Sequence, residues 1–162
     1  MNYYNKIKDV LINNEVYKKV KDYSKNKNEL NSYYEVGKLL VEAQGGEARA
    51  KYGNKLIKEY SERLTKDLGK GYSKRSLFLM RKYYLHFSKV QTLSAQLTWS
   101  HYVEILRFND NNKINYYIHM CETFNLSVRK LRERIKSNEY EGIGYKEELE
   151  EPKINDILSA LK

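Results

Sequence analysis

Residues 64–77 read LTKDLGKGYSKRSL and form the most specific segment of the sequence. Its first five residues complete a helical pattern, and Gly69-Lys70-Gly71 permits a tight turn because glycine readily adopts left-handed backbone conformations. Ser73 then precedes a second helical pattern, where its hydroxyl can accept an unpaired backbone N–H of the first turn. The stretch therefore predicts two helices joined by a short glycine-bearing turn, the arrangement of a helix-turn-helix.

The same helical pattern extends outward along the chain. Apolar residues recur at intervals of three and four, and most of the eight glycines and the single proline separate these patterns. We predict an all-α, compact fold of about six to seven helices, over residues 2–23, 28–43, 52–68, 74–87, 100–108, 111–123 and 127–140. The predicted N-caps of the fourth, fifth and seventh helices are Ser73, Ser100 and Ser127.

The charge of the chain is concentrated in one region. The chain holds 30 Lys and Arg against 21 Asp and Glu, and residues 49–90 hold 12 basic and 3 acidic residues. A basic average alone can reflect the codon bias of an AT-rich genome, but such a bias would spread the charge evenly. The concentration favours a polyanionic partner. We expect DNA rather than RNA, and no membrane, because no apolar run approaches the ~20 residues of a membrane span.

The second helix of the predicted helix-turn-helix carries charge that suits docking in the major groove. Leu77, Met80 and Tyr84 share one face, which we expect to pack on the preceding helix. The predicted DNA contacts of this region are Lys70, Tyr72, Ser73, Lys74, Arg75, Arg81 and Lys82. The alternative interpretation is an ordinary amphipathic helix whose Lys and Arg face is only solvated.

Two apolar residues of this helix, Phe78 and Leu79, fall near its outer side. Either another helix covers them, or they contact a partner subunit. Contact with a partner would favour an alternative function for the chain. In that interpretation the chain is a protein-interaction or dimerisation module, which docks to a second copy or to a restriction- or defence-system protein.

A Ser-x-Arg-x-Leu pattern recurs 54 residues after Ser73, at Ser127, and opens another basic helix. It predicts a second helix-turn-helix, and its Arg129 and Lys136 complete the set of predicted DNA contacts. The pattern also arises wherever a good cap precedes good helix formers. A purely structural role for this helix is therefore an equal alternative.

The sequence shows no catalytic constellation, and we predict no catalytic residue, no metal site and no cofactor. The three histidines, His86, His101 and His119, are too dispersed for a metal motif, and no glycine-rich phosphate loop is present. His101 and Trp99 are instead predicted to pack and cap at a helix start. The single cysteine, Cys121, is predicted to be a small core residue, which together with the absence of a signal peptide predicts a cytoplasmic protein.

Several strings resemble the N-terminal domain of YhcG-like bacterial proteins. They are Tyr52-Gly53 with Leu56-Ile57, GKGYSKRSL at residues 69–77 and QTLSAQLTWSHY at residues 91–102. The resemblance covers roughly residues 31–140. It implies a helical DNA-binding domain that is followed by a PD-(D/E)XK nuclease-type domain and is encoded near restriction-modification or defence genes. It implies no particular DNA-contacting residues.

The predicted organisation follows from this resemblance and from the composition of the last residues. We expect residues 1–141 to form the helical DNA-binding domain. Residues 142–162 contain the acidic run 147–151 and Pro152, and they are predicted to be a linker and the start of a nuclease-type domain that is missing from this chain. The chain itself is accordingly expected not to be an enzyme.

Overall fold

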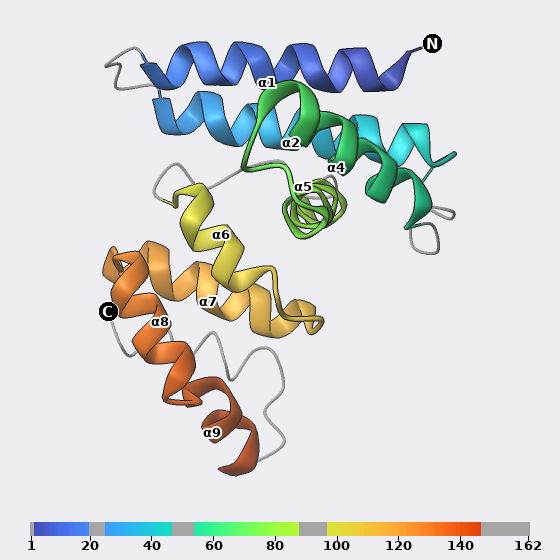
Figure 1. Ribbon diagram of the computed structural model, residues 1–162. Coiled ribbons are helices and arrows are strands. Elements are labelled where there is room, and N and C mark those ends of the chain that lie inside the picture. The colour runs from blue at the N-terminus through green and yellow to red at the C-terminus, as the bar shows by residue number, and fades with distance from the viewer. Residues whose placement is uncertain (1, 20–24, 47–53, 88–96, 147–162) are drawn as a thin grey trace. The chain divides into compact units, whose positions relative to one another are not determined.

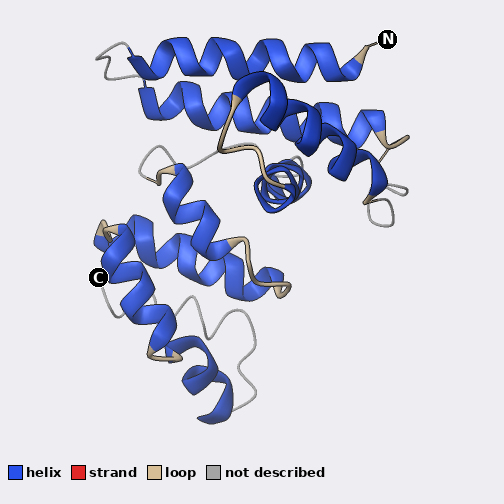
Figure 2. Ribbon diagram, in the orientation of Figure 1, coloured by secondary structure: helices blue, strands red, loops and turns tan. Residues whose placement is uncertain are grey.

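The computed structural model describes residues 2–19, 25–46, 54–87 and 97–146. Within these ranges every regular element is a helix, eight in all, and no strand occurs (Figure 1, Figure 2). The predicted all-α fold is confirmed, with eight described helices in place of six to seven. The chain divides into two compact units, residues 1–93 and residues 94–162.

The first unit contains α1 (Tyr3–Lys19), α2 (Lys25–Ala43), α4 (Lys55–Leu68) and α5 (Lys74–Phe87). Helix α2 contacts α1 and α5, while α4 packs against α5 and α1 (Figure 1). The predicted bounds of α5 are confirmed, whereas α2 begins at Lys25 rather than at Asn28. The core of this unit is therefore built from all four of these helices.

The core of the first unit is aliphatic and aromatic. Burial of each large aliphatic side chain stabilises the fold by about 1.5–3 kcal/mol. Its fully buried aliphatic side chains are Ile7, Leu11, Val36, Leu40, Ile57, Leu64 and Leu77. Tyr33, Tyr60 and Tyr83 are buried as well.

Helix α5 packs more extensively on α2 than on α4, whereas the sequence predicted packing on the preceding helix. The ring of Tyr34 in α2 meets the ring of Tyr84 edge to face, with centroids 5.1 Å apart. Because α5 is covered from two directions, Leu79 is buried, and the Arg81 guanidinium lies 4.7 Å from the centre of the half-buried Phe78 ring. Cover by other helices therefore explains the position of Leu79.

The second unit contains α6 (Trp99–Ile105), α7 (Asn111–Phe124), α8 (Val128–Lys136) and α9 (Glu139–Lys146). The sequence predicted one helix over residues 127–140, but Asn138 adopts a left-handed conformation with φ of 56° and separates α8 from α9. Helix α9 continues through the first residues of the predicted linker. Residues 147–162, with the acidic run and Pro152, lie outside the described residues.

Three helix starts, those of α5, α6 and α8, can be compared with the predicted caps. Ser73 and Ser127 cap α5 and α8, with hydroxyl oxygens 3.2 Å from the backbone N–H groups of Ser76 and Lys130. The prediction for Ser100 is wrong, because Thr98 is the N-cap of α6. Thr98 and His101 form a reciprocal capping box. The backbone N–H of His101 donates to the Thr98 hydroxyl oxygen, and the backbone N–H of Thr98 donates to the His101 ring.

His101 links the start of α6 to the turn after α7. Its Nδ1 accepts the backbone N–H of Thr98 at 3.0 Å, which leaves Nε2 to donate to the Leu126 carbonyl at 2.7 Å. The packing and capping role predicted for His101 is thus confirmed. Cys121 of α7 is also buried as predicted, and burial raises the pKa of its thiol to about 12.

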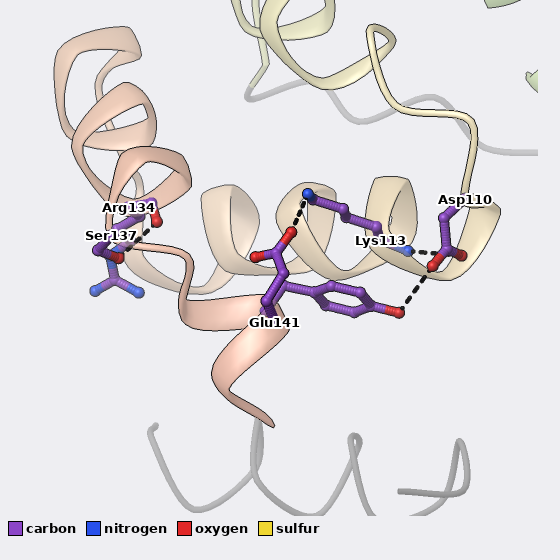
Figure 3. A network of polar contacts seen from close by, with 6 residues as sticks. Asp110, Lys113, Arg134, Ser137 and Glu141 are labelled. Carbon is purple, nitrogen blue, oxygen red and sulfur yellow. Dashed lines mark hydrogen bonds and ion pairs between the residues drawn. The ribbon is translucent and has the colours of Figure 1, made fainter. Parts of the chain in front are cut away.

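Helix α9 is held against the N-terminal half of α7 by polar side chains. Figure 3 shows Lys113 and Glu141 facing each other in an ion pair, and this hydrogen bond lowers the pKa of Glu141. The Tyr116 hydroxyl donates to Glu139 at 2.6 Å, and the Tyr140 hydroxyl donates to Asp110 at 3.3 Å. Three consecutive residues of α9 therefore bind side chains of α7 and of its N-cap.

Candidate nucleic-acid interface

The connection between α4 and α5 is a compact turn with two left-handed glycines. Gly69 has φ of 95° and Gly71 has φ of 112°, a region that glycine occupies without strain. The Gly69 backbone N–H donates to the Thr65 carbonyl at 3.0 Å and closes α4. Ser73 then caps α5, so two residues set the end of one helix and the start of the next.

Tyr72 anchors this turn to the core of the first unit. Its side chain is only 4% exposed, and its hydroxyl donates to Glu15 of α1. Burial and this hydrogen bond to a carboxylate raise the pKa of Tyr72. The Ser61 hydroxyl of α4 donates to the Tyr72 carbonyl at 2.8 Å. The turn is therefore fixed to two helices through one residue.

Four basic side chains surround the fixed turn, and we call them the α4–α5 surface. All four are exposed: Lys66 in the last turn of α4, Lys70 in the connection, and Lys74 and Arg75 in the first turn of α5. Among the described residues, no carboxylate forms an ion pair with Lys70, Lys74 or Arg75. Their charges are thus available to a ligand.

The acidic residue closest to this surface in sequence, Asp67, is already engaged. It accepts a hydrogen bond from the Tyr4 hydroxyl and lies 3.4 Å from the Lys8 amine. The hydrogen bond from Tyr4, followed by the effects of Lys8, lowers the pKa of the Asp67 carboxyl. Helix α1 therefore supplies the main partners of Asp67, with a smaller electrostatic effect from Lys66, and Lys70, Lys74 and Arg75 have no carboxylate partner in the described residues.

The structure separates Arg81 and Lys82 from this surface. Arg81 is 9% exposed and donates to the Gln44 side chain of α2 at 2.9 Å, while Lys82 is half-buried. Burial lowers the pKa of both groups. Arg81 and Tyr72 are both packed inside the first unit. The guanidinium of Arg81 binds Gln44 and the hydroxyl of Tyr72 binds Glu15, so neither polar group lies at the surface.

The two other predicted contacts, Arg129 and Lys136, belong to the second unit. Both are exposed on α8, and Arg129 lies 3.5 Å from Glu133 one turn along the helix. The sequence interpretation missed two nearby arginines that share one carboxylate, Arg107 and Arg132, both bound to Glu104. Glu104 and Arg107 are three residues apart in sequence, and this spacing is the signal that could have revealed the first pair, although Arg107 lies in the turn that follows α6. Lys66, one helical turn before Lys70, was also missed.

The described residues contain no group of three His, Cys, Asp or Glu side chains that could hold a metal ion. None of the helices in the described ranges combines the length and apolar character that a membrane crossing requires. The chemistry that the exposed side chains offer is cationic: ammonium and guanidinium groups on helix surfaces, which bind phosphate oxygens.

Comparison with known proteins places the chain in a family. A segment of 71 residues is 46% identical to an Escherichia coli (strain K12) protein named "Putative nuclease YhcG", and the match covers 41% of this chain and 19% of that protein. The chain thus matches about a fifth of the length of this relative. No solved structure matches the chain. Residues 11–142 match the DUF1016 N-terminal domain, and the chain therefore belongs to this family.

Proposed function

We propose that this chain binds duplex DNA through the α4–α5 surface. The observation that carries the proposal is that Lys70, Lys74 and Arg75 are exposed and unpaired within the described residues, around a turn that Tyr72 fixes to the core. A rigid turn holds its cations in place before binding, so less conformational entropy is lost when phosphates dock. The arrangement therefore favours a phosphate ligand over a purely solvated face.

The division of roles follows from the positions of the three residues. Arg75 lies in the first turn of α5, and a recognition helix in the major groove contacts base edges with its N-terminal residues. Its planar guanidinium can donate two parallel hydrogen bonds to a guanine. Lys70 and Lys74 contact phosphates, and Ser73 holds the helix start. Tyr72, Arg81 and Lys82 are not among the proposed contacts.

The name of the relative suggests the wider setting. The E. coli protein is named as a nuclease, and this chain matches about a fifth of its length. We propose that the domain described here supplies DNA binding to a protein whose nuclease chemistry lies in another domain. The helical region itself contributes affinity and position rather than bond cleavage.

A charge-matched pair of triple variants tests the proposed surface. We expect Lys70→Gln, Lys74→Gln and Arg75→Gln together to weaken binding to a labelled duplex at least about tenfold and to reduce the salt dependence by about three ion equivalents. The control replaces three other exposed lysines of the same unit, Lys38, Lys55 and Lys58, by glutamine. Equal effects of the two variants would show that only net charge matters and would overturn the proposed surface.

A second candidate function is protein interaction. The sequence suggested that Phe78 and Leu79 contact a partner, but Leu79 is buried within the chain. Two apolar side chains of α1 nevertheless reach solvent one helical turn apart, Ile12 at 38% and Val16 at 58% exposure. Such a pair suits an apolar contact with a second copy or with a restriction- or defence-system protein. Sedimentation of the wild type and of Val16→Ser tests this candidate, since an apolar association would weaken in the variant and respond little to salt.

A further inference from the structure

Helix α8 gives few side chains to the core and carries many charges. Of its nine residues only Leu131 is buried, and five of them are Lys or Arg against a single Glu. Val128, Arg134 and Ile135 are half-buried, so the helix gives the core a single fully buried side chain. The basic composition of α8 is therefore better explained by a binding role of its exposed side chains than by packing.

The exposed cations of α8 form a row. At 100° per residue, Arg129, Arg132 and Lys136 fall within a 60° sector of the helix, and the row is about 10 Å long. The side chains of Arg129 and Arg132 are 89% and 61% exposed, and Lys136 is exposed as well. Duplex DNA carries one charge per ~3.4 Å along each strand, so the row can meet successive phosphates.

Glu104 of α6 holds one end of this row in place. Its carboxylate is 12% exposed and lies 2.9 Å from Nε of Arg132 and 3.6 Å from a terminal nitrogen of Arg107. One carboxylate shared by two arginines leaves a surplus positive charge. The part of each guanidinium that does not face Glu104 stays available, since Arg107 is 46% exposed. Glu104 is thus a positioning residue for two arginines, one in the turn after α6 and one on α8.

The starts of α5 and α8 follow the same local plan. In each helix a serine N-cap precedes an exposed arginine at the second position and a fully buried leucine at the fourth. The capped start orients the arginine, and the leucine fixes the helix to its unit. The Ser-x-Arg-x-Leu recurrence in the sequence therefore corresponds to a shared geometry. The likeness ends at Lys82, which is half-buried where Lys136 is exposed.

We propose that Arg107, Arg129, Arg132 and Lys136, the α6–α8 surface, form a second binding surface for the phosphate backbone of DNA. The proposal rests on the proposed function, because it assigns the same class of ligand to the other unit. Arginine predominates here, whereas lysine predominates on the α4–α5 surface. The α6–α8 surface contacts phosphates without reading bases, so it adds affinity that does not depend on sequence.

Binding of labelled duplexes by the full chain tests this proposal at several salt concentrations. We expect Arg129→Gln, Arg132→Gln and Lys136→Gln together to weaken binding about tenfold or more and to lower the salt dependence by two to three ion equivalents, at about 0.9 per phosphate. The triple variant at Lys38, Lys55 and Lys58 controls for net charge. Single replacement of Lys130, which points away from the row, should have less effect than replacement of Arg129. Trp99 fluorescence checks that the second unit stays folded.

The outcomes separate this proposal from the one on which it rests. If the α4–α5 variant loses affinity and the α6–α8 variant binds as tightly as the wild type, the second surface is overturned and the proposed function stands. If only the α6–α8 variant loses affinity, the second surface stands and the α4–α5 surface is overturned. A wild-type chain that binds no DNA at low salt overturns both.

Discussion

Gly37 of α2 packs directly against the backbone of α5 at Met80. A Cβ atom added to Gly37 would stand 2.2 Å from the Met80 carbonyl oxygen and 2.8 Å from Cβ of Tyr84. The two helices therefore cross at backbone contact, and only glycine permits this approach. The crossing fixes the position of α5, whose first turn carries Lys74 and Arg75.

Replacement of Gly37 by alanine should destabilise the first unit. Alanine is the better helix former, by about 0.8–1 kcal/mol, but the added methyl group must push the α5 backbone away, at a cost of about 3 kcal/mol or more. Urea unfolding followed by circular dichroism measures the balance. The matched control is Gly142→Ala in α9, where nothing lies within 4 Å of the added atom. That variant should be as stable as the wild type or more so. A stabilised Gly37→Ala chain would refute the close crossing.

Replacement of Tyr72 by phenylalanine separates packing from DNA contact. The variant keeps the buried ring and loses the hydroxyl bond to Glu15, so the free energy of unfolding should fall by about 1–2 kcal/mol. DNA affinity, measured under conditions in which both proteins are folded, should stay within about twofold of the wild type because the hydroxyl faces α1. Stability close to wild type together with a large loss of affinity would instead make Tyr72 a DNA contact.

Two alanine variants test which residue caps α6. Thr98→Ala removes the acceptor for the His101 backbone N–H and should lower stability by about 1 kcal/mol. Ser100→Ala changes an exposed residue inside the first turn and should be neutral within about 0.5 kcal/mol. Fluorescence of Trp99, the single tryptophan, reports unfolding of this unit directly. The reverse order of the two effects would contradict the capping box.

The ion pair between Lys113 and Glu141 predicts a pH dependence of stability. The pKa of Glu141 is lowered in the folded chain, so its ionised form stabilises the fold above the unfolded pKa of about 4.3, and this contribution disappears as the pH falls through the folded value. Glu141→Gln should therefore be less stable than the wild type at neutral pH, with a gap that closes in acid. Trp99 fluorescence in urea at neutral and acidic pH measures the gap. A gap of constant size would contradict this role for Glu141.

The local features of the fold could be predicted from the sequence because they depend on neighbouring residues. A serine before a helical pattern and glycines between patterns gave the bounds of α5 and the start of α8. Two local expectations were wrong for physical reasons. The His101 ring favours Thr98 over Ser100 as the cap, and a left-handed Asn138 breaks a helix whose apolar pattern runs on.

The candidate site was harder to predict, because exposure depends on packing between distant helices. Lys70, Lys74 and Arg75 are exposed, but Tyr72 and Arg81 are turned into the first unit by Glu15 of α1 and by α2. The spacing of residues along α5 does not show that α2 packs on this helix in addition to α4. Glu104 also binds Arg132 of α8, and only the folded chain displays this relationship.

We propose that this chain binds DNA through exposed cations, and the salt dependence of binding is the decisive measurement. Fluorescence anisotropy of a labelled duplex should show binding whose logarithmic affinity falls linearly between about 50 and 200 mM salt, with a slope of about −3 or steeper for three or more phosphate contacts. Absence of binding at low salt, or binding that salt leaves unchanged, would contradict the claim and assign the basic surface to a different partner.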